Sequence, residues 1–146
     1  MPHYGLMDET KISEEDAALM RARLHLRGGR RRLQEGLAVA GLAALYDALL
    51  FGMRYYIAGH ERCASLVENA DLWDAVAMYH VLARAGIFDD AYAFDRLSLI
   101  VERALWQESF SFDADTTLAD VEKMLTKLGV MPFNEATLPG ELPVAH

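Results

Sequence analysis

The stretch ALYDALLFGMRYYIA, residues 44–58, decides how the rest of the sequence is interpreted. It belongs to a longer apolar segment in which Asp47 and Arg54 are the only charged residues between positions 37 and 59. As a helix, this segment is about long enough to cross a bilayer. Asp47 would then lie near the centre of the span, where a carboxylate costs about 2.5–3.5 kcal/mol. The segment therefore predicts the buried central helix of a soluble bundle, with no membrane as partner.

The overall composition is that of an ordinary folded domain. The 146 residues are 53% hydrophobic and 25% charged, which is enough for one core in one domain. The formal net charge of −8 argues against general nucleic-acid binding, because duplex phosphates would repel the molecule. The first ten residues lack the basic and apolar regions of a secretory signal, and Cys63 is the one cysteine. Together these features predict a cytoplasmic protein.

Capping residues and glycines predict two long helices in the first half of the chain. Ser13 precedes three acidic residues and is a favourable N-cap, so a first helix begins there and runs into an arginine-rich segment. Gly28-Gly29 costs roughly 1 kcal/mol per glycine inside a helix, and the sequence leaves open whether this pair breaks the helix or bends it. A helical pattern resumes at RRRLQEGLAVAG and reaches about Ala58, before Gly59.

Three further helices are predicted in the second half. One begins at an Asp71 cap and ends before Gly86, the next opens at Asp89 or Asp90, and the last spans 117–128. Asp113 and Asp115 are also interpreted as helix caps. The expected apolar stripes are Leu72, Val76, Tyr79 and Ala83; Leu97, Ile100, Val101, Ala104 and Leu105; and Leu118, Val121, Leu125 and Leu128.

These elements predict an all-α fold, a single-domain bundle of about five helices over residues 13–129, because strand patterns are nearly absent. Residues 1–12 are expected to form a flexible N-terminal segment. Three prolines in residues 130–146 predict an extended C-terminal tail on the surface.

The order of these segments resembles that of HEPN domains, small helical bundles named for nucleotide binding. Three stretches carry the resemblance: AGLAALYDALLFGMRYYI, AVAMYHVLARAGIFDDAYAFDRLSLIVERAL and DADTTLADVEKMLTKLGV. The resemblance implies a helical bundle and, as one alternative, nucleotide or RNA binding. HEPN proteins that cleave RNA carry an arginine followed four to six residues later by a histidine, near the start of a late helix.

In this chain the matching region is Arg103-ALWQES, which contains no histidine. Arg54-YYIAG-His60 has the required spacing but lies at the end of the second predicted helix. A chain with eleven arginines and five histidines is expected to contain about one such match by chance. We therefore predict no catalytic residues, and no motif in the sequence supports enzymatic activity.

The most unusual feature of composition is a cluster of six arginines within twelve positions. Its members are Arg21, Arg23, Arg27, Arg30, Arg31 and Arg32. Guanidinium groups make bidentate contacts with phosphate, so the last four of these are candidates for binding a nucleotide, RNA or an acidic partner. The alternative is a solvated helix face that balances the acidic residues from Asp8 to Asp16. No aromatic residue is interleaved, which disfavours stacking of single strands.

Asp47, Arg54 and His60 form a second candidate site. Asp47 and Arg54 are two helical turns apart, with about 10 Å of rise between them, and so lie on nearly the same face. They can bracket a polar pocket, or each can pair with a neighbouring helix, because an unpaired buried charge costs several kcal/mol. His60-ER-Cys63 has a spacing suited to zinc, but a zinc site needs three or four ligands and no second pair is present. No metal and no cofactor are therefore predicted.

The central helix also has more apolar surface than one stripe requires. Small residues at Gly36, Ala40, Ala43 and Ala44 would allow another helix to approach closely. The sequence thus predicts a non-catalytic interaction module that forms a homodimer or binds a protein partner. The alternative is a nucleotide- or RNA-binding protein of HEPN type that uses the cluster Arg21–Arg32. A metal-dependent bundle enzyme is disfavoured, because the Glu-x-x-His pairs of di-iron bundles are absent.

Overall fold

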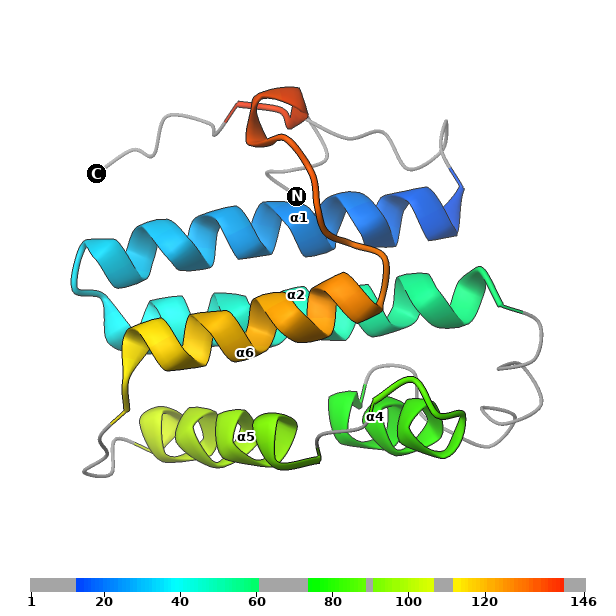
Figure 1. Ribbon diagram of the computed structural model, residues 1–146. Coiled ribbons are helices and arrows are strands. Elements are labelled where there is room, and N and C mark those ends of the chain that lie inside the picture. Colours follow the sequence, from blue (N-terminus) through cyan, green and yellow to red (C-terminus); the bar gives the residue numbers. More distant parts are fainter. Residues whose placement is uncertain (1–12, 61–73, 89–90, 107–111, 141–146) are drawn as a thin grey trace.

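The computed structural model describes residues 13–60, 74–88, 91–106 and 112–140, and these form the all-α bundle that the sequence predicts (Figure 1). Its five α-helices are α1 (Glu14–Gln34), α2 (Ala38–Ala58), α4 (Ala75–Arg84), α5 (Ala91–Leu105) and α6 (Ala114–Lys127). A short 3-10 helix, η2 (Glu135–Thr137), follows, and no strand occurs among the described residues. The expected flexible segment 1–12 lies outside these residues.

Helices α1 and α2 form a long antiparallel hairpin (Figure 1). The Ser13 hydroxyl caps α1 as predicted, accepting a hydrogen bond of 3.0 Å from the Asp16 amide. Helix α1 runs without interruption through Gly28-Gly29, which answers the question that the sequence left open. The chain instead turns at Gly36, whose φ of 79° is a left-handed conformation suited to glycine. The prediction that the second helix resumes at the triple arginine is therefore wrong.

Close contact between the hairpin helices explains why the glycine pair is tolerated. A Cβ atom at Gly29 would lie 2.8 Å from Leu45 Cδ2 and 3.3 Å from the Gly41 carbonyl oxygen. A Cβ at Gly41 would in turn lie 2.8 Å from Leu33 Cγ. The absence of side chains here lets the two backbones approach, so the glycines serve the packing of α1 on α2.

Helix α2 is the central element of the bundle, as the sequence predicts. It packs against α1, α4, α5 and α6, and ten of its residues are buried. By length and composition alone α2 also meets the criteria for a membrane span, which a buried core helix satisfies equally. Leu42, Leu45, Leu49 and Met53 are at most 1% exposed and form the centre of the core.

The buried face of α4 differs from the one that the sequence predicts. The Asp74 carboxylate caps the helix, accepting hydrogen bonds from the amides of Val76 and Ala77, whereas the expected cap Asp71 lies outside the described residues. Val76 is 42% exposed, so its predicted place in the buried stripe is wrong. The residues of α4 that are buried are Ala75, Met78, Tyr79, Val81 and Leu82.

Helices α5 and α6 follow their predicted stripes more closely. Leu97, Val101 and Ala104 of α5 are buried, but Leu105 is 64% exposed and does not belong to the core. The expected caps Asp89 and Asp90 lie outside the described residues. Helix α6 begins three residues before the predicted start, because the Asp113 carboxylate accepts hydrogen bonds from the amides of Asp115 and Thr116. Its inward residues include Val121, Leu125 and Leu128, as expected.

The C-terminal segment differs from the extended surface tail that the prolines suggest. Residues 130–140 return from α6 across α1 and include η2 (Figure 1). Val130 is fully buried and Leu138 is 8% exposed. This segment therefore contributes to the core and covers one side of α1, while residues 141–146 lie outside the described part of the chain.

Candidate functional site

Three arginines of the predicted cluster hold the C-terminal segment against α1. Arg23 Nε donates to the Val130 carbonyl oxygen at 3.0 Å, and its guanidinium lies 5.2 Å from the ring centroid of Phe133. Arg27 Nη1 donates to the Pro139 carbonyl oxygen at 2.8 Å. Both contacts satisfy backbone carbonyls that a helix or sheet would otherwise satisfy, so these arginines have a structural role.

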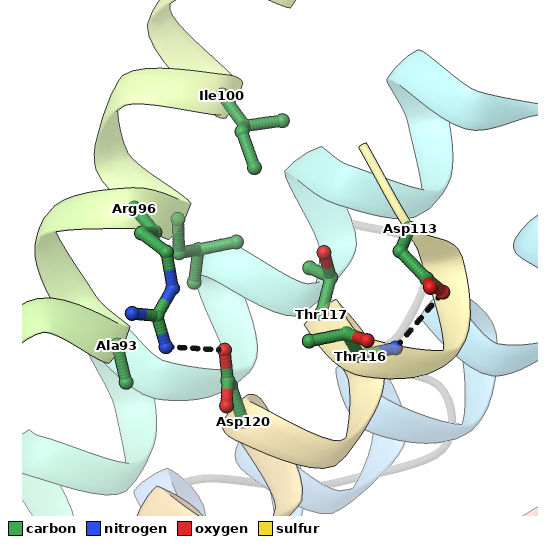
Figure 2. Close-up of a pocket in the computed structure, with 8 residues that line it drawn as sticks. Ala93, Arg96, Ile100, Asp113, Thr116, Thr117 and Asp120 are labelled. Carbon is green, nitrogen blue, oxygen red and sulfur yellow. Dashed lines mark hydrogen bonds and ion pairs between the residues drawn. The ribbon is translucent and has the colours of Figure 1, made fainter. Parts of the chain in front are cut away.

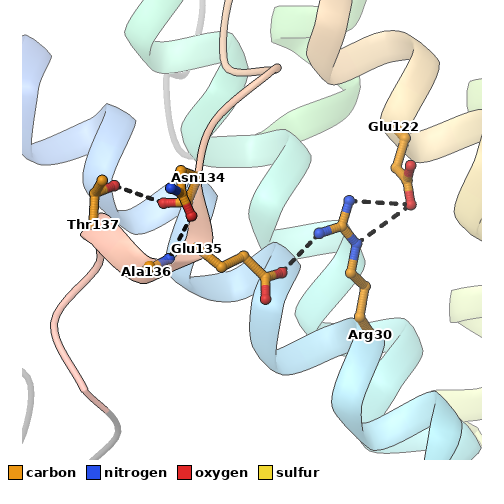
Figure 3. A network of polar contacts seen from close by, with 6 residues as sticks. All are labelled: Arg30, Glu122, Asn134, Glu135, Ala136 and Thr137. Carbon is orange, nitrogen blue, oxygen red and sulfur yellow. Dashed lines mark hydrogen bonds and ion pairs between the residues drawn. The ribbon is translucent and has the colours of Figure 1, made fainter.

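Arg30 is the centre of a small polar network (Figure 3). Its Nη1 atom donates to Glu135 Oε1 at 2.7 Å, and Nη2 lies 3.3 Å from Glu122 Oε1. Asn134 caps η2 beside it by accepting a hydrogen bond from the Ala136 amide. One guanidinium thus joins α1, α6 and the C-terminal segment, and two carboxylates already occupy the positions that a phosphate would take.

The last two arginines of the cluster are separate from this network. Arg31 Nε lies 3.7 Å from Glu35 Oε1, one turn further along α1. Arg32 is half-buried and its guanidinium lies beside Gly28, and its side chain makes no ion pair or hydrogen bond with any other described residue. The predicted site Arg27, Arg30, Arg31 and Arg32 is therefore divided between different contacts and does not converge on one anion.

Asp47 and Arg54 are also not partners of each other. Arg54 Nη2 lies 3.4 Å from Glu14 Oε1, an ion pair with α1 of the kind that the structural alternative predicts. Asp47 is half-buried on α2, and its carboxylate makes no ion pair or hydrogen bond within the described part of the chain. Burial raises the pKa of the Asp47 carboxyl above its ordinary value, because desolvation disfavours the charged form.

His60 lies at the end of α2 and contacts its own helix. The ring stacks on Tyr56, with centroids 3.8 Å apart, and its Nδ1 atom lies 2.8 Å from the Tyr56 carbonyl oxygen. Cys63, the other half of the possible zinc pair, lies outside the described residues. Within the described ranges no three His, Cys, Asp or Glu side chains lie close enough to hold a metal ion.

An aromatic cluster in the α2, α4 and α5 layer was not apparent from the sequence. Tyr79 stacks on Phe94 with centroids 4.3 Å apart, and Tyr46 packs on the same ring at 6.2 Å. Burial raises the pKa of the Tyr46 phenol, although the nearby Ser98 hydroxyl lowers it. The phenol therefore stays protonated near neutral pH. The cluster is part of the core, and the Tyr46 and Ser98 hydroxyls form its polar edge.

A small pocket lies between α5 and α6 (Figure 2). Its volume is about 120 Å³, and its lining residues are Ala93, Arg96, Leu97, Ile100, Asp113, Thr116, Thr117 and Asp120. Arg96 and Asp120 form an ion pair of 3.2 Å across it, and Asp113 is engaged in capping α6. The charged groups of the pocket are thus already engaged, Arg96 with Asp120 and Asp113 with the start of α6, and the space suits a few water molecules.

Among the described residues, several large hydrophobic side chains are exposed on α5 and at the α1–α2 turn. On and just after α5 these are Leu99 at 49%, Leu105 at 64% and Trp106 at 74% exposed. Leu37 and Val39 are 51% and 47% exposed where α1 turns into α2, a turn that lies at the same end as the C-terminus of α5 (Figure 1). The sequence does not predict this surface, because the apolar spacing places Leu105 in the core and the surplus apolar residues on α2.

No protein-family model, curated protein or solved structure matches the chain. The resemblance to HEPN domains therefore stays a prediction.

Proposed function

We propose that this protein is a non-catalytic helical-bundle interaction module that acts as a homodimer. The observation that carries the proposal is the exposed apolar surface of α5, together with that of the α1–α2 turn at the same end of the bundle (Figure 1). Trp106, at 74% exposed, is its most prominent member. Tryptophan is enriched at the centres of protein interfaces, and burying apolar surface contributes about 25 cal/mol per Å².

The contacts of the polar candidate residues favour an interaction role over catalysis. Arg54 pairs with Glu14 of α1, and His60 stacks on Tyr56 at the end of α2. An arginine–histidine ribonuclease site would need both groups directed at one substrate phosphate. Arg54 instead links α2 to α1, and His60 contacts only a residue of its own helix in the described contacts.

Nucleotide or RNA binding of HEPN type is the less supported alternative. Arg23, Arg27 and Arg30 contact the C-terminal segment or α6, and the net charge of the chain is −8. A polyanion would have to displace these contacts before it reached the guanidinium groups. No structural feature at Arg31 and Arg32 favours phosphate over solvent.

Sedimentation velocity over a concentration series tests the proposal. We expect the wild-type protein to shift from monomer to dimer between about 1 and 100 μM, because weak dimers dissociate on dilution. Trp106→Ala is expected to remain monomeric over that range. Val76→Ala removes an exposed hydrophobic side chain from α4 and is the matched control, which should dimerise as the wild type does. A wild-type monomer at every concentration would overturn the proposal.

A further inference from the structure

The exposed residues of α5 follow a regular helical spacing, which a general hydrophobic patch would lack. Leu99, Glu102, Arg103 and Trp106 follow the spacing i, i+3, i+4, i+7, so they fall within about 100° of the helix circumference. The buried residues Leu97, Val101 and Ala104 lie on the opposite side of the helix. The exposed face therefore points away from the bundle core and is available to a second molecule.

Two opposite charges lie between the two apolar residues of this face. Glu102 and Arg103 are both exposed, and the side chain of neither makes an ion pair or hydrogen bond with another described residue. Elsewhere on α5, Arg96 is paired with Asp120 of α6. The central charges of the face thus differ from Arg96 in having no partner within the described bundle.

The sequence of this face is complementary to itself when it is read in the opposite direction. The midpoint between Glu102 and Arg103 is also the midpoint between Leu99 and Trp106. In two antiparallel helices related by a two-fold axis through that midpoint, each Glu102 faces the Arg103 of the other helix. Each Leu99 likewise faces the other Trp106, so that one register satisfies both the charges and the apolar residues.

We propose that the partner surface of this protein is the same surface of a second copy, with α5 packed antiparallel on α5 about this axis. This inference rests on the proposed function, since it specifies how the homodimer forms. The interface is isologous: each copy contributes the same four residues, and every contact occurs twice. A second copy is favoured over an unrelated partner because the face carries both charges in equal number, in an order that pairs only with its own reverse.

Interface size limits the affinity of this pairing. Helices packed at 8–10 Å apart bury little beyond the side chains of the contact. One helix pair therefore lies at the low end of the range for specific interfaces, even if Leu105 and the α1–α2 turn extend it. The dimer is expected to be reversible at micromolar concentration. Dimerisation would bury the Trp106 side chain of each copy, so assembly should be visible as a change in tryptophan fluorescence.

Charge-reversal variants test the register by sedimentation equilibrium. Glu102→Arg places four arginines around the axis and Arg103→Glu places four glutamates there, so each variant alone is expected to weaken dimerisation about tenfold or more. The double variant Glu102→Arg/Arg103→Glu exchanges the two charges without altering composition, and should restore the wild-type dissociation constant to within about threefold. An equimolar mixture of the two single variants should form a heterodimer more tightly than either forms a homodimer.

Lys123→Glu is the matched control for net charge. Lys123 is exposed on α6, and its reversal changes the net charge by the same amount as Arg103→Glu. The control should leave dimerisation unchanged, and circular dichroism should report the same helix content for every variant. Higher salt should weaken the difference between the single and double variants, because it screens exposed charges.

The outcomes separate this inference from the proposed function. A wild-type dimer that is indifferent to both single reversals, or a mixture that forms no heterodimer, would overturn the α5 register while the homodimer itself stands. A wild-type protein that stays monomeric would overturn both. Recovery in the double variant together with the heterodimer would establish the antiparallel pairing.

Discussion

Alanine at Gly28 and alanine at Gly29 are expected to change stability in opposite directions. Both glycines are buried in α1, but they meet different neighbours. A Cβ at Gly28 would lie 2.5 Å from Arg32 Nη1, the far end of a flexible side chain that can move. A Cβ at Gly29 would lie 2.8 Å from Leu45 Cδ2 and 3.3 Å from the Gly41 carbonyl oxygen, which is part of the α2 backbone.

The size of each effect follows from two terms. Replacing a glycine inside a helix by alanine favours the helix by about 1 kcal/mol. Overpacking a tight contact costs about 1–3 kcal/mol, and the cost is high where backbone must move. Gly28→Ala avoids the overpacking cost, because the Arg32 side chain can move, and should stabilise the protein by about 0.5–1 kcal/mol. Gly29→Ala carries the overpacking cost, because the α2 backbone would have to move, and should destabilise the protein by about 1–2 kcal/mol.

Urea unfolding followed by circular dichroism measures the difference directly. The midpoint should rise for Gly28→Ala and fall for Gly29→Ala, with the slope unchanged in both. In thermal unfolding, each kcal/mol corresponds to about 3 °C for a chain of this size. If Gly29→Ala were as stable as the wild type, α1 and α2 would not be in the close contact described. If Gly28→Ala were destabilised, α1 would not be continuous at that glycine.

Three further changes test the polar contacts by the same unfolding assay. Because the pKa of Asp47 is raised in the folded protein, the contribution of Asp47 to stability is fully present below the ordinary carboxyl pKa and is lost as pH rises through the raised value. Asp47→Asn should remove this pH-dependent contribution and stabilise the protein at pH 7, and no gain there would refute the burial argument. Asp113→Ala should cost about 1 kcal/mol through loss of the α6 cap, whereas an unchanged midpoint would show that the cap contributes nothing. Arg30→Ala should cost about 1–2 kcal/mol, because two carboxylates lose their common partner. Arg31→Ala, which removes one longer ion pair of a more exposed side chain, should cost less than about 0.5 kcal/mol, and equal effects would contradict the network.

Local signals in the sequence predicted the elements of this fold well. Ser13 and Asp113 cap helices as their residue types suggest, and Gly86 and Gly129 follow helix ends with positive φ. Such signals act over a few residues, so one chain is enough to detect them. Gly28-Gly29 was ambiguous for the same reason: its effect depends on α2, which local sequence does not place.

The candidate site was harder to predict because its contacts are distant in sequence. Arg30 and Glu122 are 92 residues apart, and Arg27 and Pro139 are 112 residues apart. A cluster of arginines looks the same whether it faces phosphate or a returning chain end, and only the packing of residues 130–140 on α1 distinguishes the two. The exposed face of α5 was missed because Leu105 continues the apolar period while lying at the very end of the helix.

The packing of the C-terminal segment on α1 has a consequence for folding during translation, because α1 is synthesised long before the segment that covers it. Arg30 emerges from the ribosome 105 residues before Glu135, which at about 5–20 residues per second is an interval of roughly 5–20 s. During that time the α1–α2 hairpin can form, but the carbonyls and carboxylates that cover its arginines have not yet been made. In the nascent chain Arg23, Arg27 and Arg30 therefore lack the contacts that the C-terminal segment supplies in the finished protein.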